Sequence, residues 1–163
     1  MLSIVKSMTL HGLEGFIVDV QVDVAGGLPC WEIVGLPDVS IRESKERVRT
    51  AIKNSGYEFP SRRIVINLAP ATIKKVGSAF DLPIAIAILL ATENINEFNF
   101  ESIAFVGELS LDGNVHSITG VLPMCIEAKK LGMREIIVPK ENAKEASIVD
   151  GINIIPVSSL NQV

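Results

Sequence analysis

The side chains of this sequence that could do chemistry gather in the segment ATIKKVGSAFDLP (71–83). A serine hydroxyl becomes a nucleophile when a lysine amine within hydrogen-bond reach accepts its proton. Ser78 could be such a nucleophile, with Lys74 and Lys75 beside it in sequence. Both lysines share the loop of the serine rather than facing it from another element, so the spacing does not favour a hydrolytic pair.

Asp81 directly precedes the apolar run Leu82–Ala91. We expect it to be the N-cap residue of a helix, because an Asp side chain accepts hydrogen bonds from the free N–H groups of the first turn. A carboxylate there would repel a phosphate, and the chain holds no G-x-x-x-x-G-K-[ST] string. The sequence therefore predicts no nucleotide site in this segment.

Other residue types that bind metals or transfer protons are isolated. His11 and His116 have no companion at metal-ligand spacing, and the two cysteines lie far apart. Glu108 and Asp112 are four residues apart, but the Asp-Gly pair at 112–113 is a hairpin turn signal that explains Asp112. We expect no metal ion and no bound cofactor.

Charge is unevenly distributed along the 163 residues, whose formal net charge is −4. Residues 42–75 carry a net charge of +6 and the remaining residues carry −10. Four of the cations follow one another at helical spacing after Pro37, and four more lie near a strand that comes next. The tentative nucleic-acid or subunit contacts are Arg42, Lys45, Arg49, Lys53, Arg62, Arg63, Lys74 and Lys75.

Three interpretations of this basic set remain open. It could be an ordinary solvated helix face with local ion pairs, such as Glu43 with Arg47. It could follow the phosphates of DNA, with salt-sensitive binding and little sequence preference. It could also meet the acidic side of a neighbouring subunit or of an ATPase module.

The first half of the chain alternates in the manner of strands. Leu2, Ile4, Met8 and Leu10 share one face, and after the turn at 12–15 the even-numbered residues from Phe16 to Val24 share another. We expect these two strands to pair as a hairpin and a third strand to follow at 30–35.

A helix is expected after Pro37, capped by Asp38 or Ser40 and ended by Gly56. The strand RRIVINLAP (62–70) is apolar at nearly every position, so we expect it to be central and covered on both faces. Residues 71–80 are expected to form a loop, and the next helix is apolar on all sides and should be deeply buried.

The second half predicts the order β-turn-β-α-β-α-β. The expected strands are 102–110, 115–118, 135–139 and 152–157, and the expected helices are 121–132 and 141–149. Hairpins and crossovers together favour an α/β (α+β) fold with two layers and one core. The longest apolar run has ten residues, shorter than the roughly 18 that a membrane helix needs, so we expect a soluble, cytoplasmic chain.

Four strings occur in order: IVGLPDVSIRESKERVRTAIKNSGYEFP (33–60), RIVINLAPATIKKVGSAFDLPIAIAIL (63–89), GELSLDGNVHSITGVLP (107–123) and IVPKENAKEA (137–146). Together they resemble the N-terminal domain of the YifB/ComM family of magnesium-chelatase-related AAA+ ATPases. The resemblance covers essentially all of residues 1–163 as a single domain. It implies a fold like the second domain of ribosomal protein S-five, shared with the Lon proteolytic domain, the C-terminal domain of RadA and the GHMP kinases. It also implies an AAA+ module after residue 163.

The resemblance to Lon implies where a serine–lysine dyad would lie. Aligned through the apolar helix, the serine position is Asp81, and aligned through the GELSLDG turn, the lysine position is Leu122. An acid and an aliphatic group cannot replace that dyad, so we expect no catalytic residue in this chain. The alternative is a degenerate peptidase or GHMP-kinase-like enzyme that uses the loop 74–83.

The resemblance also implies a role and partners. The domain would serve assembly, regulation or DNA engagement of an ATP-driven motor that is associated with competence and recombination. ATP and magnesium are expected in the AAA+ module rather than here. The expected partners are that module, neighbouring subunits of a ring homo-oligomer and DNA, with no membrane.

Overall fold

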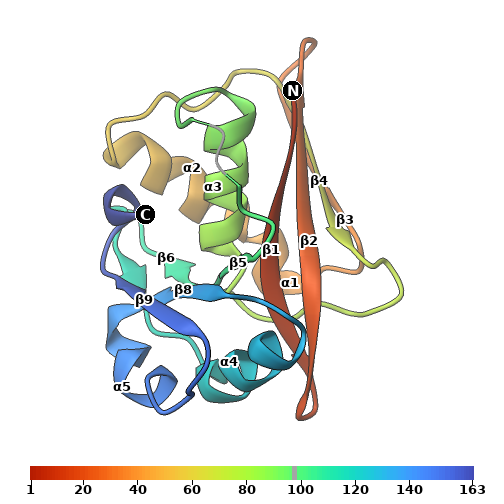
Figure 1. Ribbon diagram of the computed structural model, residues 1–163. Helices are drawn as coiled ribbons and strands as arrows, with labels where there is room; N and C mark the ends of the chain where they lie inside the picture. The colour runs from red at the N-terminus through yellow and green to blue at the C-terminus, as the bar shows by residue number, and fades with distance from the viewer. Residues whose placement is uncertain (97–98) are drawn as a thin grey trace.

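The computed structural model describes residues 1–96 and 99–163, and within them the centre is a seven-stranded mixed sheet (Figure 1). The strands of the chain are β1 (Leu2–His11), β2 (Glu14–Ala25), β3 (Cys30–Val34), β4 (Arg63–Ala69), β5 (Ile103–Phe105), β6 (Glu108–Leu109), β7 (Val115–His116), β8 (Glu135–Pro139) and β9 (Asn153–Val157). The sheet has the order β3-β4-β2-β1-β5-β8-β9, and β6 and β7 form a separate hairpin. The pairs β1-β2 and β2-β4 are antiparallel, and the other neighbours in the sheet are parallel.

The predicted hairpin of two long strands is confirmed, but the apolar face predicted for β1 is buried only toward its end, where Met8 is 0% exposed and Leu10 packs against a second core cluster. Leu2 and Ile4 are exposed, whereas Ser3, Val5 and Ser7 are buried. The antiparallel register places Val5 opposite Val20, so the odd-numbered residues of β1 share the core face with the valines of β2. The buried serines are satisfied, since their hydroxyls donate to backbone carbonyls at 2.6 and 2.8 Å.

The helices are α1 (Val39–Arg42), α2 (Ser44–Asn54), α3 (Asp81–Ala91), α4 (Val121–Lys130) and α5 (Ala143–Ala146), with single 3₁₀ turns η1 (Lys140–Asn142) and η2 (Leu160–Gln162). Every residue of α3 is buried, which confirms the prediction for the helix that is apolar on all sides. It packs against β1, β2 and α2. No helix among the described residues is long and apolar enough to cross a membrane.

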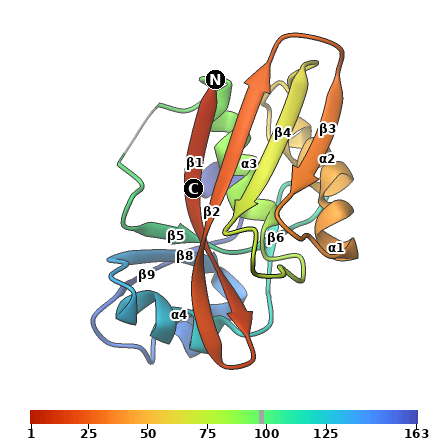
Figure 2. The ribbon, with the colours of Figure 1, turned by 90° about the vertical axis from the view of Figure 1, so that its right-hand side faces the viewer.

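The sheet is covered unevenly. Figure 1 places α2 and α3 on one face of β1, β2, β4 and β3, and Figure 2 looks onto the opposite face of these strands. On β4, Ile64, Ile66 and Leu68 are buried while Val65 and Asn67 are half-buried. The prediction that this strand is central and covered on both faces is therefore wrong. β4 lies second from the edge, beside β3.

The helix predicted after Pro37 is interrupted at Glu43, between α1 and α2. Asp38 caps α1 as expected, because its Oδ1 accepts a hydrogen bond from the Ile41 N–H at 2.9 Å. At the interruption, the Ser40 carbonyl accepts a hydrogen bond from the Arg47 guanidinium at 2.7 Å. Gly56 follows α2 with a φ of 91°, as expected for the residue after a helix end.

In the second half, the single strand expected over 102–110 is divided into β5 and β6 by Val106 and Gly107. The backbone of Gly107 turns toward α3, since its N–H donates to the Ala79 carbonyl and its carbonyl accepts from the Leu82 N–H. The hairpin at LDGN is confirmed, with Leu109 opposite Val115. The helix expected over 141–149 is shorter and consists of η1 and α5.

Candidate functional site

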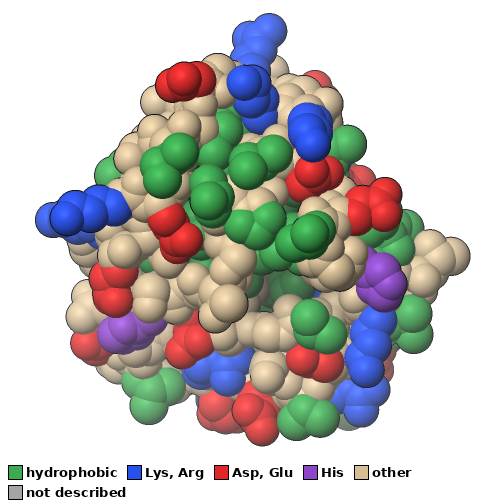
Figure 3. Space-filling view, turned by 90° about the horizontal axis from the view of Figure 1, so that it is seen from below, with side chains coloured by type: hydrophobic (Ala, Val, Ile, Leu, Met, Phe, Trp, Pro, Cys, Tyr) green, Lys and Arg blue, Asp and Glu red, His purple; other side chains and the backbone are tan. Residues whose placement is uncertain are grey.

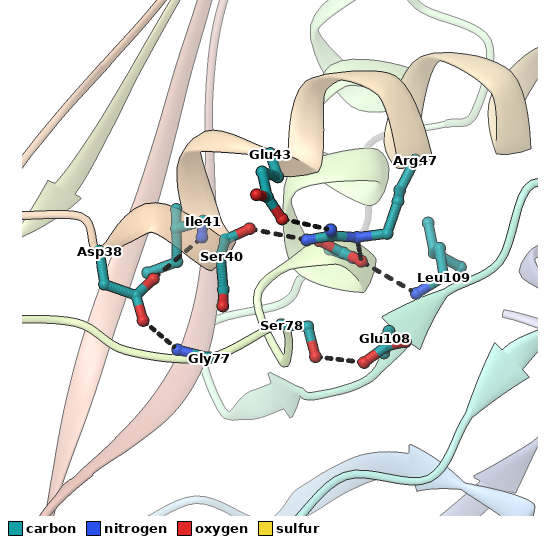
Figure 4. A network of polar contacts seen from close by, with 10 residues as sticks. Asp38, Ser40, Ile41, Glu43, Arg47, Gly77, Ser78, Glu108 and Leu109 are labelled. Carbon is teal, nitrogen blue, oxygen red and sulfur yellow. Dashed lines mark hydrogen bonds and ion pairs between the residues drawn. The ribbon is translucent and has the colours of Figure 1, made fainter.

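The candidate site lies at the start of α3, where Arg47, Glu108 and Leu109 lie close together (Figure 4). The side chain of Asp81 at this point is 1 % exposed. The prediction that Asp81 caps this helix is wrong. The N-cap residue is Phe80, and Asp81 is the first helical residue. Its carboxylate turns away from the free N–H groups of the first turn and toward α2.

Arg47 of α2 holds this carboxylate in a two-point ion pair. Its Nε donates to Asp81 Oδ2 at 2.6 Å, and a terminal nitrogen donates to Oδ1 at 3.1 Å. The Leu109 N–H of β6 also donates to Oδ2, at 3.2 Å. Because Arg47 bonds to Ser40 as well, one partly buried cluster joins α1, α2, α3 and β6.

Burial and charge act in opposite directions on this pair. Burial raises the pKa of Asp81 to about 6, although the hydrogen bonds and charge of Arg47 work to lower it. Glu108 adds a smaller upward shift because it is a second acid nearby. The pKa of Arg47 is raised, mainly by its hydrogen bond to Asp81.

The sequence predicted Arg47 only as an exposed partner of Glu43. That contact is present at 3.9 Å, but the shorter bonds of Arg47 go to Asp81. A signal was available, because an acid at the start of an entirely apolar helix must be buried and needs a cation or several N–H donors. Nothing in the spacing indicated that the cation would come from 34 residues earlier.

Ser78 lies close to this cluster but its hydroxyl has an acidic partner. The Ser78 Oγ donates to the Glu108 carboxylate in a short hydrogen bond. The Nζ of Lys75, in the same loop, donates to the Gly35 carbonyl at 2.9 Å and to the Pro70 carbonyl. The structure therefore gives Ser78 an acceptor, while the amine of Lys75 is bonded to backbone oxygens.

Lys75 has to be removed from the predicted contact set. Its side chain is fully buried, and the prediction that it lies on a contact surface is wrong. Burial lowers the pKa of its amine. Leu122, at the expected lysine position, is the second residue of α4 and is half-buried.

The other predicted contacts lie at or near the surface. Lys45 is half-buried and the remaining six are exposed: Arg42, Arg49, Lys53, Arg62, Arg63 and Lys74. The Arg49 guanidinium lies over the Phe59 ring at 5.8 Å, and Arg63 pairs with Glu32 at 3.4 Å. Arg42 and Lys74, distant in sequence, line the same hollow of about 390 Å³.

A second hollow, of about 260 Å³, lies beside the loop that carries Ser78. Met8, Leu10, Phe80 and Met124 give it an apolar lining. Figure 3 views the molecule from below, where hydrophobic side chains gather around a hollow in that face. Within residues 1–96 and 99–163, no three His, Cys, Asp or Glu side chains are grouped so that they could hold a metal ion.

Comparison with known proteins defines the class. Residues 20–142 match the family model described as subunit ChlI of Mg-chelatase, and the chain belongs to this family of magnesium-chelatase-related proteins. It is 40% identical over 152 residues to the competence protein ComM of Haemophilus influenzae, and 43% identical over 150 residues to YifB of Escherichia coli. These matches cover 93% and 92% of this chain but only 30% and 29% of the relatives.

A more distant relative supports the fold. The chain is 30% identical over 178 residues to Lon protease 2 of Bacillus subtilis, a match that covers 98% of this chain and 32% of that protein. The mixed sheet with its buried central helix is a Lon-like domain fold. The expected resemblance to the YifB and ComM proteins is confirmed, and the AAA+ module after residue 163 stays a prediction.

Proposed function

We propose that this chain is a non-hydrolytic Lon-like domain of a magnesium-chelatase-related AAA+ ATPase, with a role in assembly, regulation or DNA engagement. The observation that carries the proposal is the environment of Asp81. Its carboxylate, at the expected nucleophile position, is bound by Arg47 and by the Leu109 N–H. A carboxylate held in this way stabilises the fold, and neither it nor Leu122 at the expected lysine position supplies the hydroxyl and amine of a Lon-type dyad.

The loop 74–83 supports the same conclusion. Ser78 donates to an acidic group, and the nearby buried amine of Lys75 is bonded to two carbonyls. A serine protease of this type needs the amine within about 3 Å of the hydroxyl.

The test is an assay of the purified chain with casein and with fluorogenic peptides. We expect no turnover above the buffer background, and the same result for Ser78→Ala. Cleavage by the wild type that disappears in Ser78→Ala would contradict the proposal and favour a degenerate peptidase. Heat released on titration with ATP and magnesium would favour the kinase-like alternative.

DNA engagement is the part of this role that the surface favours. Three of the four cations on α1 and α2 are exposed and Lys45 is half-buried. The ComM relative is described as a competence protein. Because Arg and Lys contacts to phosphate carry little sequence information, such binding would be general and sensitive to salt.

Fluorescence anisotropy with labelled duplex and forked DNA measures this binding. We expect the double variant Arg42→Ala, Arg49→Ala to bind more weakly, and Lys129→Ala, Lys130→Ala on α4 to bind as the wild type does. An equal loss of DNA affinity in both double variants would contradict a role for the surface of α1 and α2. An affinity that does not change with the salt concentration would contradict it as well. ATP hydrolysis and magnesium binding are proposed for the AAA+ module.

A further inference from the structure

The hollow that Arg42 and Lys74 line has an apolar floor open to solvent. Leu36 is 52% exposed and Val39 is 69% exposed, and both line this hollow together with Pro37. Side chains of this kind are normally covered when they gather at one place. We call Leu36, Val39, Arg42 and Lys74 the α1 hollow.

The backbone beneath the α1 hollow is held rigidly. Lys75 donates its N–H to the Leu36 carbonyl, and its own carbonyl accepts from the Asp38 N–H, both at 3.0 Å. Asp38 Oδ2 accepts from the Gly77 N–H at 2.9 Å. Leu36 itself has a φ of 56°, a left-handed conformation that costs free energy for a leucine. The surface is therefore preorganised, which reduces the entropy lost when a partner binds.

Its charges indicate what kind of partner fits. Arg42 and Lys74 make no ion pair within residues 1–96 and 99–163, whereas both carboxylate oxygens of Asp38 already accept backbone N–H groups. The α1 hollow thus offers two free cations beside apolar side chains. Nucleic-acid phosphates would satisfy the cations but leave Leu36 and Val39 uncovered. A polypeptide that carries an apolar side chain next to a carboxylate satisfies both.

This chain itself carries such a feature at the turn between β1 and β2. This turn lies at the lower end of the molecule in Figures 1 and 2, beside α4, which contacts both strands. Leu13 in that turn is 86% exposed and is followed by the exposed Glu14. Leu13 and Glu14 together therefore present an apolar side chain directly beside a carboxylate, the combination that the α1 hollow lacks.

We propose that the Leu13–Glu14 tip of one copy of this chain binds in the α1 hollow of a second copy. Leu13 covers Leu36 and Val39, and Glu14 lies against Arg42 and Lys74. The charges of the two surfaces support this pairing, since Glu14 of the tip is acidic and Arg42 and Lys74 of the hollow are basic. Because tip and hollow are different surfaces, the contact is heterologous and builds rings or open chains rather than a two-fold dimer.

Sedimentation velocity of the 163-residue chain tests the proposal, at about 5 to 500 µM because a small interface is weak, and in about 50 mM salt to limit screening. We expect the mean mass to rise with concentration for the wild type. Leu13→Ser and Val39→Asp should each raise the dissociation constant about tenfold or more, as loss of a central apolar contact does. The matched control is Leu28→Ser, which changes a leucine that is 88% exposed in another turn.

Reversing the charges of Glu14 and Arg42 tests whether these two side chains contact each other. Glu14→Arg and Arg42→Glu should each weaken association, and the variant that carries both changes should recover it, because the tip then brings an arginine to a glutamate. A chain that stays monomeric at all concentrations would overturn the proposal. Association that is unaffected by Leu13→Ser, or equally weakened by Leu28→Ser, would overturn it as well.

The outcome is distinguishable from that of DNA engagement. Because Arg42 is assigned to both contacts, the anisotropy is measured at protein concentrations below those at which the chain associates. Leu13→Ser should then leave the anisotropy with DNA unchanged, whereas Lys53→Ala should weaken DNA binding and leave association unchanged. If Val39→Asp weakens DNA binding while the chain stays monomeric, the α1 hollow is a nucleic-acid contact and the proposal is wrong.

Discussion

At the scale of single residues, the Arg47–Asp81 pair combines a large desolvation cost with well-formed hydrogen bonds. Asp81 is 1 % exposed and the Arg47 side chain is 22% exposed, so the pair lies at the boundary between core and solvent. A buried pair of this kind contributes little net free energy to folding when intact, but removal of one partner leaves the other as an unpaired buried charge. Its value to the fold is that it specifies how α2, α3 and β6 meet.

Arg47→Ala should therefore destabilise the chain strongly. With Arg47 removed, the Leu109 N–H is the one donor left to the Asp81 carboxylate among residues 1–96 and 99–163, and we expect a loss of about 3 to 5 kcal/mol in the free energy of unfolding. Urea denaturation followed by circular dichroism measures it. The double variant Arg47→Ala, Asp81→Asn should lose less than Arg47→Ala alone. A loss below about 1 kcal/mol for Arg47→Ala would show that the pair is solvated.

The raised pKa of Asp81 predicts how stability depends on pH. Since burial raises the pKa from 3.8 to about 6, the folded chain binds this proton more tightly than the unfolded chain does. The resulting stabilisation is complete below pH 3.8 and is lost as the pH rises through about 6.

Relative to Asp81→Asn, the wild type should therefore gain about 1 kcal/mol of unfolding free energy between pH 7 and pH 5. Urea denaturation of both proteins at the two pH values checks the sign. If the wild type instead loses stability relative to Asp81→Asn at pH 5, the ion pair dominates over burial.

At the scale of elements, hydrogen bonds of Lys75 connect the loop between β4 and α3 to the segment before α1. The amine of Lys75 bonds to the Gly35 and Pro70 carbonyls, and its backbone bonds to Leu36 and Asp38. The neighbouring Lys74 is exposed, which makes the two lysines a natural comparison.

Lys75→Ala should destabilise the chain by about 2 to 4 kcal/mol, because it leaves a cavity and removes the hydrogen-bond donor of the Gly35 and Pro70 carbonyls. Lys74→Ala should change stability by less than about 0.5 kcal/mol. Thermal unfolding of both variants measures the contrast. Similar effects from the two changes would mean that Lys75 is solvated.

The passage of the chain from β3 to α1 depends on a glycine. A Cβ on Gly35, whose φ is 102°, would lie 2.2 Å from the Leu68 carbonyl oxygen of β4. Gly27 has a comparable φ of 125°, but a Cβ there would meet no atom within 4 Å.

Gly35→Ala should thus lower the free energy of unfolding by about 1 to 3 kcal/mol more than Gly27→Ala does. Both changes strain the backbone, but only the new Cβ at position 35 clashes with β4. Urea denaturation of the two variants gives the difference. Equal losses would show that β3 moves away from β4 without penalty.

At the scale of the whole molecule, the charge distribution matters more than the net charge. A chain with a net charge of −4 binds phosphates only if its cations are segregated, and six of the eight predicted contacts are exposed. Arg42 and Arg49, from α1 and α2, are two of these six.

For DNA, the logarithm of the binding constant should fall linearly with the logarithm of the salt concentration. Removal of Arg42 and Arg49 together should reduce the steepness of that slope by about 1.8, which corresponds to two phosphate contacts. Anisotropy titrations at several salt concentrations measure it. An unchanged slope would show that neither side chain touches a phosphate.

Local patterns in the sequence determined much of this fold. The alternation of β2, the apolar surface of α3, the Asp38 cap and the hairpin at LDGN are all present as expected. These features depend on residues a few positions apart, so their periodicity and turn chemistry can be read from the chain itself.

Only the tertiary structure decided which distant residues meet. It paired Arg47 with Asp81, buried Lys75 among carbonyls, placed Ser3 and Ser7 of β1 in the core, and brought Arg42 beside Lys74. A polar group can be buried only where a hydrogen-bonding or charged partner lies next to it. Strand register and helix packing decide which residue that partner is. The positions of Asp81 and of the α1 hollow therefore depend on contacts across tens of residues, which no local pattern specifies.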